Sequence, residues 1–138
     1  MTPFLSRPFR IEWGDCDPAG IVFAPRYLDM LTENTIRLFE EAGLGKKRDM
    51  MGTHGLLGYP LIDCSAKFLR PCRYGDDVLI ESAAPTFGRS SFTIEARITL
   101  DGETCVEYQE KRVWAVPDAE RGMRSAAVPE DVRAAFVR

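Results

Sequence analysis

Two aspartates lie close together in a short segment that is rich in turn-forming residues. Residues 14–22 read Gly-Asp-Cys-Asp-Pro-Ala-Gly-Ile-Val, which places Asp15 and Asp17 in one loop just before a predicted helix. The first turn of a helix has unpaired backbone N–H groups and a partial positive charge, and both stabilise anions. A carboxylate beside a helix start therefore suits a reaction that needs an ionised group and donors for a developing oxyanion.

The two aspartates also allow simpler interpretations. Either residue could be a turn former or a helix cap, and we assign Asp15 to hydrogen bonding within the loop. A calcium-binding loop is excluded, because Arg26 stands at the twelfth position, where an EF-hand needs a bidentate glutamate.

The loop lies between a short predicted strand and one long predicted helix. Residues 9–13 alternate apolar and polar side chains, as a half-buried strand does. After the loop, Pro25 suits a first helical turn, apolar residues recur at helical spacing from Leu28 to Ala42, and Gly43 is a typical stop. Residues 45–58 have no clear period and are interpreted as a mobile connection.

Four later segments have the pattern of strands, separated by turn-forming residues. They are Leu61–Leu69, Asp77–Ala84, Ser91–Leu100 and Thr104–Val116, and residues 129–138 have the pattern of a short helix. Asp101-Gly102 predicts a two-residue hairpin between the last two strands. Short links favour antiparallel neighbours, and only the long helix can cover the apolar face of such a sheet. The sequence thus predicts one α+β domain over residues 1–138, with an antiparallel sheet wrapped around one long central helix.

The composition is that of a globular protein and excludes several classes of partner. Hydrophobic residues make up 45% of the chain and charged residues 28%, and the formal net charge is -3, which gives no reason to expect nucleic acid or an anionic membrane as a partner. The four cysteines form no C-x-x-C pair and there is one histidine, so we expect no metal site. Without a recognisable signal peptide, the thiols are interpreted as free and the protein as cytoplasmic.

Two motifs make a family resemblance recognisable. Gly14 to Val22, followed by Pro25-x-Tyr27, resembles the loop of the 4-hydroxybenzoyl-CoA thioesterase family of the hotdog fold. A second stretch, Phe68-Leu69-Arg70-Pro71 and then Tyr74-Gly75-Asp76-Asp77, is similar to a later segment of that family. The resemblance runs from about Phe9 to Val116 and implies a hotdog fold and the hydrolysis of acyl-CoA, with an aromatic or a short to medium acyl group and no cofactor.

The resemblance also implies roles for the loop and the helix start. Asp17 takes the place of the catalytic carboxylate, which either attacks the thioester carbonyl or activates a water that does so. Backbone N–H groups of Phe23 and Ala24 are the implied oxyanion donors.

CoA recognition is implied at a turn later in the chain. Arg89 matches a basic cluster that holds the CoA phosphates in the family, and the hydroxyls of Ser90 and Ser91 could add hydrogen bonds. The alternative is a solvated turn charge. An acidic residue that meets the substrate hydroxyl in 4-hydroxybenzoyl members is replaced here by Thr32, which argues against that particular substrate.

Four further residues are candidates for the pocket. Trp13, Tyr27 and Tyr59 could line an aromatic pocket, and each could equally belong to the core. His54 is the only histidine and lies in a glycine-containing segment that could approach the site; the alternative is an exposed loop histidine.

Acyl-CoA thioester hydrolysis has two competing interpretations on the same fold. One is a non-catalytic acyl-CoA binder or sensor, which would keep Arg89 but would need no Asp17. The other is a thioesterase that acts on acyl carrier protein. In each case we expect a homo-oligomer, a dimer or a tetramer, with CoA near the subunit boundary.

Overall fold

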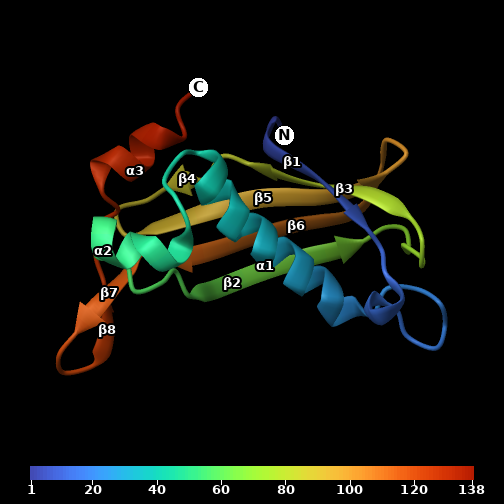
Figure 1. Ribbon diagram of the computed structural model, residues 1–138, viewed down its shortest axis with the longest axis horizontal. Coiled ribbons are helices and arrows are strands. Elements are labelled where there is room, and N and C mark those ends of the chain that lie inside the picture. Colours follow the sequence, from blue (N-terminus) through green and yellow to red (C-terminus); the bar gives the residue numbers. More distant parts are fainter.

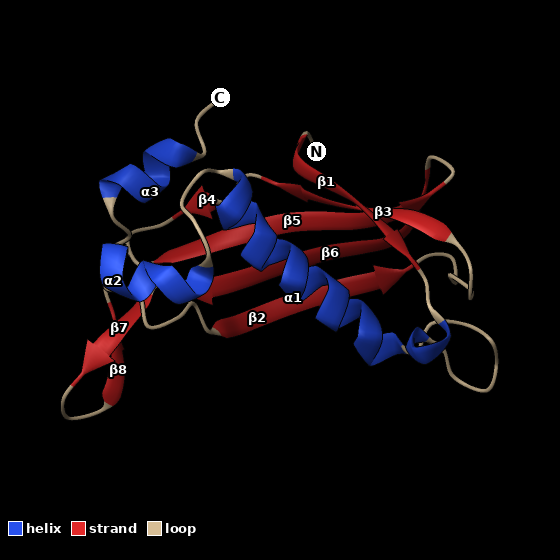
Figure 2. Ribbon diagram, in the orientation of Figure 1, coloured by secondary structure: helices blue, strands red, loops and turns tan.

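A long helix lies across one face of an antiparallel sheet in the computed structural model, which describes residues 1–138 (Figures 1 and 2). The strands of this sheet follow the order β1-β3-β5-β6-β2, and the short β4 pairs with β5. Their bounds are β1 Pro3–Arg10, β2 Leu61–Phe68, β3 Asp77–Ala83, β4 Thr86–Phe87, β5 Ser91–Leu100 and β6 Glu103–Val113. This is the α+β arrangement that the sequence predicts.

The helix, α1 (Ala24–Glu41), is held against the sheet by an apolar stripe. Met30, Leu31 and Leu38 are buried on it, at the helical spacing expected of a face that packs on a core. The chain leaves α1 through Gly43, whose positive φ of 86° favours glycine after a helix end. The predicted helix and its stop are confirmed.

Strand β5 has one apolar face, which packs against the helix. Every second side chain from Phe92 to Leu100 is buried, whereas Thr93, Glu95 and Arg97 between them are partly or fully exposed. The turn to β6 has positive φ at both Asp101 (52°) and Gly102 (79°), as a primed two-residue hairpin requires. The predicted hairpin is confirmed.

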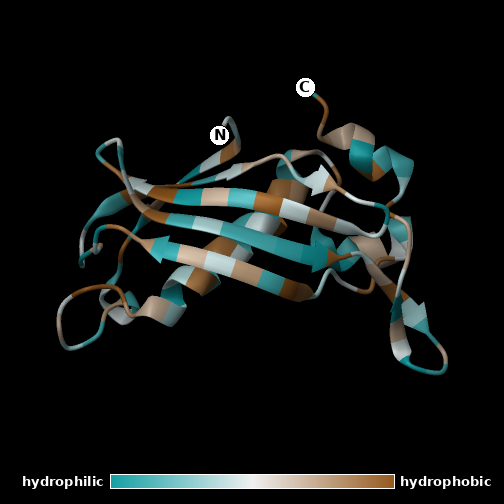
Figure 3. Ribbon diagram, turned by 180° about the vertical axis from the view of Figure 1, so that it is seen from behind, coloured by the Kyte–Doolittle hydropathy of each residue, from teal (hydrophilic) through white to brown (hydrophobic).

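No helix covers the outer face of the sheet, and the residues of β6 there are largely hydrophilic (Figure 3). A row of opposite charges crosses four strands on this face. The register places Glu107 opposite both Lys67 and Arg97, and Arg97 in turn opposite Glu81. Arg97 and Glu81 form an ion pair with an N···O distance of 3.2 Å.

The first strand lies earlier than predicted, over Pro3–Arg10 rather than residues 9–13. β1 is an edge strand, where Pro3 and Pro8 are tolerated because one side of the strand needs no ladder bonds. The chain then turns through a 3-10 helix, η1 (Trp13–Asp15), because the Asp15 carboxylate accepts the Glu12 N–H at 2.8 Å.

Two other predicted segments need correction. Residues 45–58 contain a 3-10 helix, η2 (Lys47–Asp49), and a short helix, α2 (Met50–His54), because Met50 and Leu56 are buried in the core. The last predicted strand is divided at the buried Trp114, after which β7 (Ala115–Asp118) pairs with β8 (Gly122–Ser125) as a separate hairpin.

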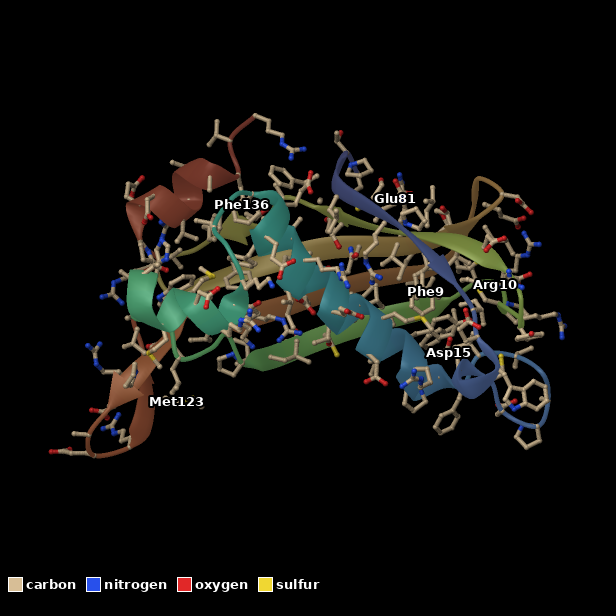
Figure 4. The ribbon with its side chains drawn as sticks, viewed as in Figure 1. Phe9, Arg10, Asp15, Glu81, Met123 and Phe136 are labelled. Atoms are coloured by element: carbon tan, nitrogen blue, oxygen red, sulfur yellow. The ribbon has the colours of Figure 1, made fainter.

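The C-terminal segment closes the end of the core that lies away from the start of α1. Helix α3 (Glu130–Ala135) and Phe136 pack there, and Phe136 contacts Phe4 and Phe39 with ring centroids 5.1 Å and 5.2 Å apart. The β7–β8 hairpin, which carries Met123, projects from the same end (Figure 4). None of the helices is long and apolar enough to cross a membrane.

Candidate active site

Asp17 lies in a closed loop whose base is tied by main-chain hydrogen bonds. Its own N–H donates to the Ile21 carbonyl at 3.0 Å, and its carbonyl accepts the Gly20 N–H at 2.9 Å. Its Oδ1 accepts the Ala19 N–H at 2.8 Å, and its Oδ2 accepts no hydrogen bond from the protein. The half-buried carboxylate is therefore fixed through one oxygen and free through the other.

The start of α1 offers one unpaired main-chain donor beside this loop. Phe23 precedes the helix, and its N–H donates to the Asp15 carbonyl at 2.9 Å. Pro25 has no N–H, and the Arg26 N–H donates to the Phe23 carbonyl at 2.8 Å. This leaves the N–H of Ala24, which donates to no protein acceptor. Of the two predicted oxyanion donors, the Phe23 N–H is engaged in closing the base of the loop, and the Ala24 N–H is free.

Asp15 connects this loop to the helix through a buried carboxylate. The Asp15 side chain is 4% exposed, and its Oδ1 accepts Nη2 of Arg26 at 2.8 Å and Nε at 3.2 Å. Arg26 also donates through Nη1 to Asp29 at 2.9 Å. The hydrogen bond from Asp15 raises the pKa of the Arg26 guanidinium above its usual value. Figure 4 shows Asp15 at the start of α1.

Two of the predicted pocket aromatics lie near the loop. Trp13 is 80% exposed and contacts Tyr74 edge to face, with ring centroids 6.0 Å apart. Tyr27 is buried, its ring lies 5.6 Å from that of Phe68, and its hydroxyl accepts the Cys72 N–H at 3.1 Å. Burial raises the pKa of the Tyr27 hydroxyl and raises that of the Cys72 thiol to about 12.

Tyr59 belongs instead to the apolar core at the other end of the helix. Its ring stacks on Phe39 at 5.1 Å and meets Phe92 at 5.8 Å. Its hydroxyl is buried without a hydrogen-bond partner. Tyr59 is therefore a core residue, as the alternative interpretation held.

His54 and the predicted CoA-binding turn also lie at that far end. His54 ends α2, where Nε2 lies 2.7 Å from the Asp131 carboxylate of α3. The carbonyl of Arg89, between β4 and β5, accepts the Val128 N–H at 2.9 Å; Ser90 and Ser91 follow it. Figure 1 shows α2, α3 and β4 at the opposite end of the molecule from the start of α1. One chain alone therefore does not bring these residues to Asp17.

The structure also contains a buried ion pair that sequence reasoning missed. Glu110 on β6 is fully buried and accepts Nε and Nη2 of Arg112, at 2.7 Å and 3.1 Å. Thr35 donates to the same carboxylate at 2.7 Å and Tyr108 at 2.8 Å. The sequence signal was a charged residue at an inward position of a strand, which the alternation of β6 places on the helix side.

Sequence reasoning missed Arg26 as well, although its position in the chain could have indicated a role. A cation in the first turn of a helix opposes the helix dipole, so its presence there calls for a carboxylate partner.

No group of three His, Cys, Asp or Glu side chains is arranged to hold a metal ion.

Comparisons with known proteins show the family of this chain. The sequence profile of the Thioesterase-like superfamily matches residues 11–136. The 4-hydroxybenzoyl-CoA thioesterase of Pseudomonas sp. (strain CBS-3) is 36% identical over 136 residues, which cover 95% of this chain and 96% of that enzyme.

Solved structures match over nearly the whole chain. The D17N mutant of 4-hydroxybenzoyl CoA thioesterase, complexed with 4-hydroxybenzoyl CoA, has a TM-score of 0.88 and 32% identity, over 96% of this chain and 98% of that one. A gentisyl-coenzyme A thioesterase has a TM-score of 0.82 and 28% identity, over 96% and 100%. These similarities confirm the predicted hotdog fold.

Proposed function

Because this chain belongs to the Thioesterase-like superfamily, we propose that it hydrolyses acyl-CoA thioesters with Asp17 as the catalytic carboxylate and the Ala24 N–H as an oxyanion donor. One observation carries the proposal: a carboxylate with one free oxygen and a helix-start N–H without an acceptor belong to the same loop and helix junction. The relatives that match it act on CoA thioesters, as their names state.

Two routes use these groups. In the first, an Asp17 oxygen bonds to the acyl carbon while the C–S bond breaks, which releases CoA thiolate and leaves an acyl-aspartyl anhydride that water hydrolyses. In the second, Asp17 takes a proton from water, the hydroxide oxygen bonds to the acyl carbon, and the thiolate leaves. In both routes the negative charge on the carbonyl oxygen is stabilised by the Ala24 N–H.

We propose a second copy of the chain as the partner that completes the site. β2 is an unpaired edge with exposed apolar side chains, including Ile62 and Phe68, which are 56% and 55% exposed. A two-fold axis that lies beside the middle of β2, between the two paired strands, would bring the Leu61 end of one strand beside the Phe68 end of the other. Phe68 contacts Tyr27 near the catalytic loop, so this pairing would bring Arg89 and His54 of one subunit toward Asp17 of the other.

We also propose an aromatic acyl group as the preferred substrate and the cytoplasm as the location. The names of two matching enzymes, which act on 4-hydroxybenzoyl-CoA and gentisyl-CoA, support an aromatic acyl group. Thr32 provides no carboxylate for a phenol, which favours benzoyl or phenylacetyl groups over 4-hydroxybenzoyl. Four free cysteines suit a reducing compartment.

The test measures thiol release with a chromogenic thiol reagent from benzoyl-, phenylacetyl-, 4-hydroxybenzoyl- and straight-chain acyl-CoAs. Asp17→Asn should lower kcat by at least about a thousandfold while the acyl-CoA still binds. Glu33→Gln, which neutralises an exposed carboxylate of α1, is the matched control and should keep full activity. Full turnover by Asp17→Asn would refute the proposed role. Binding without turnover by the unmodified protein would favour an acyl-CoA sensor or a carrier-protein substrate.

A further inference from the structure

Arg26 occupies a position that a cation normally avoids. It is the third residue of α1, where the unpaired N–H groups make the helix end electropositive, and the first turn contains no acidic residue. The Arg26 guanidinium is nevertheless tied on both sides, to Asp15 in the loop and to Asp29 one turn further along the helix.

Asp15 passes this connection on to the catalytic loop. Its Oδ2 accepts the Glu12 N–H at 2.8 Å, and its carbonyl accepts the Phe23 N–H at 2.9 Å. The Asp15 side chain is almost fully buried, so these donors and Arg26 stabilise its carboxylate in place of water. One residue thereby joins the end of β1, the base of the loop and the start of the helix.

The two groups of the proposed site lie close to these contacts, one in the loop and one at the first residue of α1. Asp17 lies two residues after Asp15, and Ala24 directly follows Phe23, whose N–H closes the loop on the Asp15 carbonyl. The separation and orientation of the Asp17 carboxylate and the Ala24 N–H therefore depend on where Asp15 is held. Arg26 is the only side chain that ties Asp15 to the body of the helix.

We propose that Arg26 is a positioning residue for thioester hydrolysis. Through Asp15 it holds Asp17 and the Ala24 N–H in the mutual geometry that the reaction needs, without contact with the substrate. This inference rests on the proposed role of Asp17. Small misplacements of reacting groups are costly to catalysis, so releasing Arg26 should lower kcat strongly while the stability of the fold changes little.

The central variant is Arg26→Gln, compared with Arg37→Gln as the matched control. Arg37 is an exposed arginine of the same helix that pairs with Glu33 at 3.2 Å, remote from the loop. Arg26→Gln should lower kcat by about 10- to 100-fold with KM within about twofold, whereas Arg37→Gln should leave both constants unchanged. Arg26→Lys should rescue only part of kcat, because one ammonium cannot bridge Asp15 and Asp29 as the planar guanidinium does.

Two further measurements separate positioning from a general loss of structure. The double variant Asp15→Asn/Arg26→Gln should be no slower than the slower single variant, because the two residues act as one unit. Hydrogen exchange of the amides in residues 16–23 should accelerate in Arg26→Gln, with the rest of the chain unchanged. Should Arg26→Gln fold poorly, Asp29→Asn loosens the same guanidinium from the exposed side and should lower kcat by a few fold.

Asp17→Asn is measured in the same series. If Asp17→Asn is inactive and Arg26→Gln has the kcat of the unmodified protein, the positioning role of Arg26 is refuted and the proposed function stands. If Asp17→Asn is fully active, the proposed function fails first, whatever the result for Arg26. An equal loss in Arg26→Gln and Arg37→Gln would also refute the inference.

Discussion

Replacing Glu110 with Gln should lower the free energy of unfolding by about 3–5 kcal/mol, because it leaves a buried guanidinium without its carboxylate. Glu110 is fully buried, and the Arg112 side chain is 8% exposed. The remaining Arg112 contacts, to the Tyr59 carbonyl at 3.1 Å and to Thr32 at 3.5 Å, are to neutral groups and cannot replace the lost charge.

The size of the effect follows from the contacts of the carboxylate. Four donor atoms reach it at 2.7–3.1 Å, and hydrogen bonds to a charged group contribute about 1.5–3 kcal/mol each. Gln keeps one acceptor oxygen, so part of the network survives. Its NH2 group is a donor that faces other donors, so the hydrogen bonds to that side of the side chain are lost. The predicted loss corresponds to a Tm lower by about 10–20 °C for a domain of this size.

The assay is urea unfolding followed by far-UV circular dichroism, at one fixed protein concentration. Glu33→Gln removes an exposed ion pair with Arg37 and should cost less than about 1 kcal/mol. The double variant Glu110→Met/Arg112→Met removes both charges and should be more stable than Glu110→Gln. A cost below about 1 kcal/mol for Glu110→Gln, or a double variant less stable than the single one, would refute the reasoning.

Three further predictions follow from the site and its surroundings. Ala24→Pro removes the free N–H, so kcat should fall about 100- to 1000-fold. It removes no existing hydrogen bond, and proline is tolerated at the first helical position, so Tm should be unchanged. Ala24→Gly, which keeps the N–H, should retain activity. Burial raises the pKa of the Cys72 thiol from 9.0 to about 12. Above pH 9 the unfolded chain therefore loses this proton before the folded chain does, and the free energy of unfolding falls as the pH rises to 12. In Cys72→Ala this fall should be shallower by about 1 kcal/mol per pH unit, as measured by urea unfolding at pH 9.5–10.5. Ile62→Lys on the exposed edge of β2 should give a monomer, as measured by light scattering, and this monomer should have low activity. Val137 is also apolar and is 80% exposed, and Val137→Lys should not change the oligomer. An unchanged oligomer in Ile62→Lys would place the subunit contact elsewhere.

Features that depend on local pattern could be predicted from the sequence. The helix from Ala24 to Glu41, the stop at Gly43 and the turn at Asp101-Gly102 follow from periodicity and turn chemistry, which act over a few residues. β1 was placed too late, because its two prolines argue against a strand unless the strand is known to lie at an edge. Edge position is a property of the whole sheet, and no local window contains it.

The candidate site was predictable as a loop and not as a hydrogen-bond network. The sequence motif pointed to Asp17 as the candidate carboxylate, and the helix start indicated a donor nearby. The choice between Phe23 and Ala24 depends on the bond from Phe23 to the Asp15 carbonyl, which only the folded loop shows. Tyr59 and His54 could not be assigned from residue type, because both positions depend on how residues 45–59 pack against the far end of the core.

The charge row on the outer face of the sheet has a consequence for folding accuracy. A slip of two residues between β5 and a neighbouring strand would keep the side chains of Ile94, Ala96 and Ile98 on the inner face, so apolar burial discriminates weakly against it. Arg97 stands between Glu81 of β3 and Glu107 of β6, and a slip on either side separates it from one of these partners. The polar face thus helps to select one strand alignment among several that the core would accept.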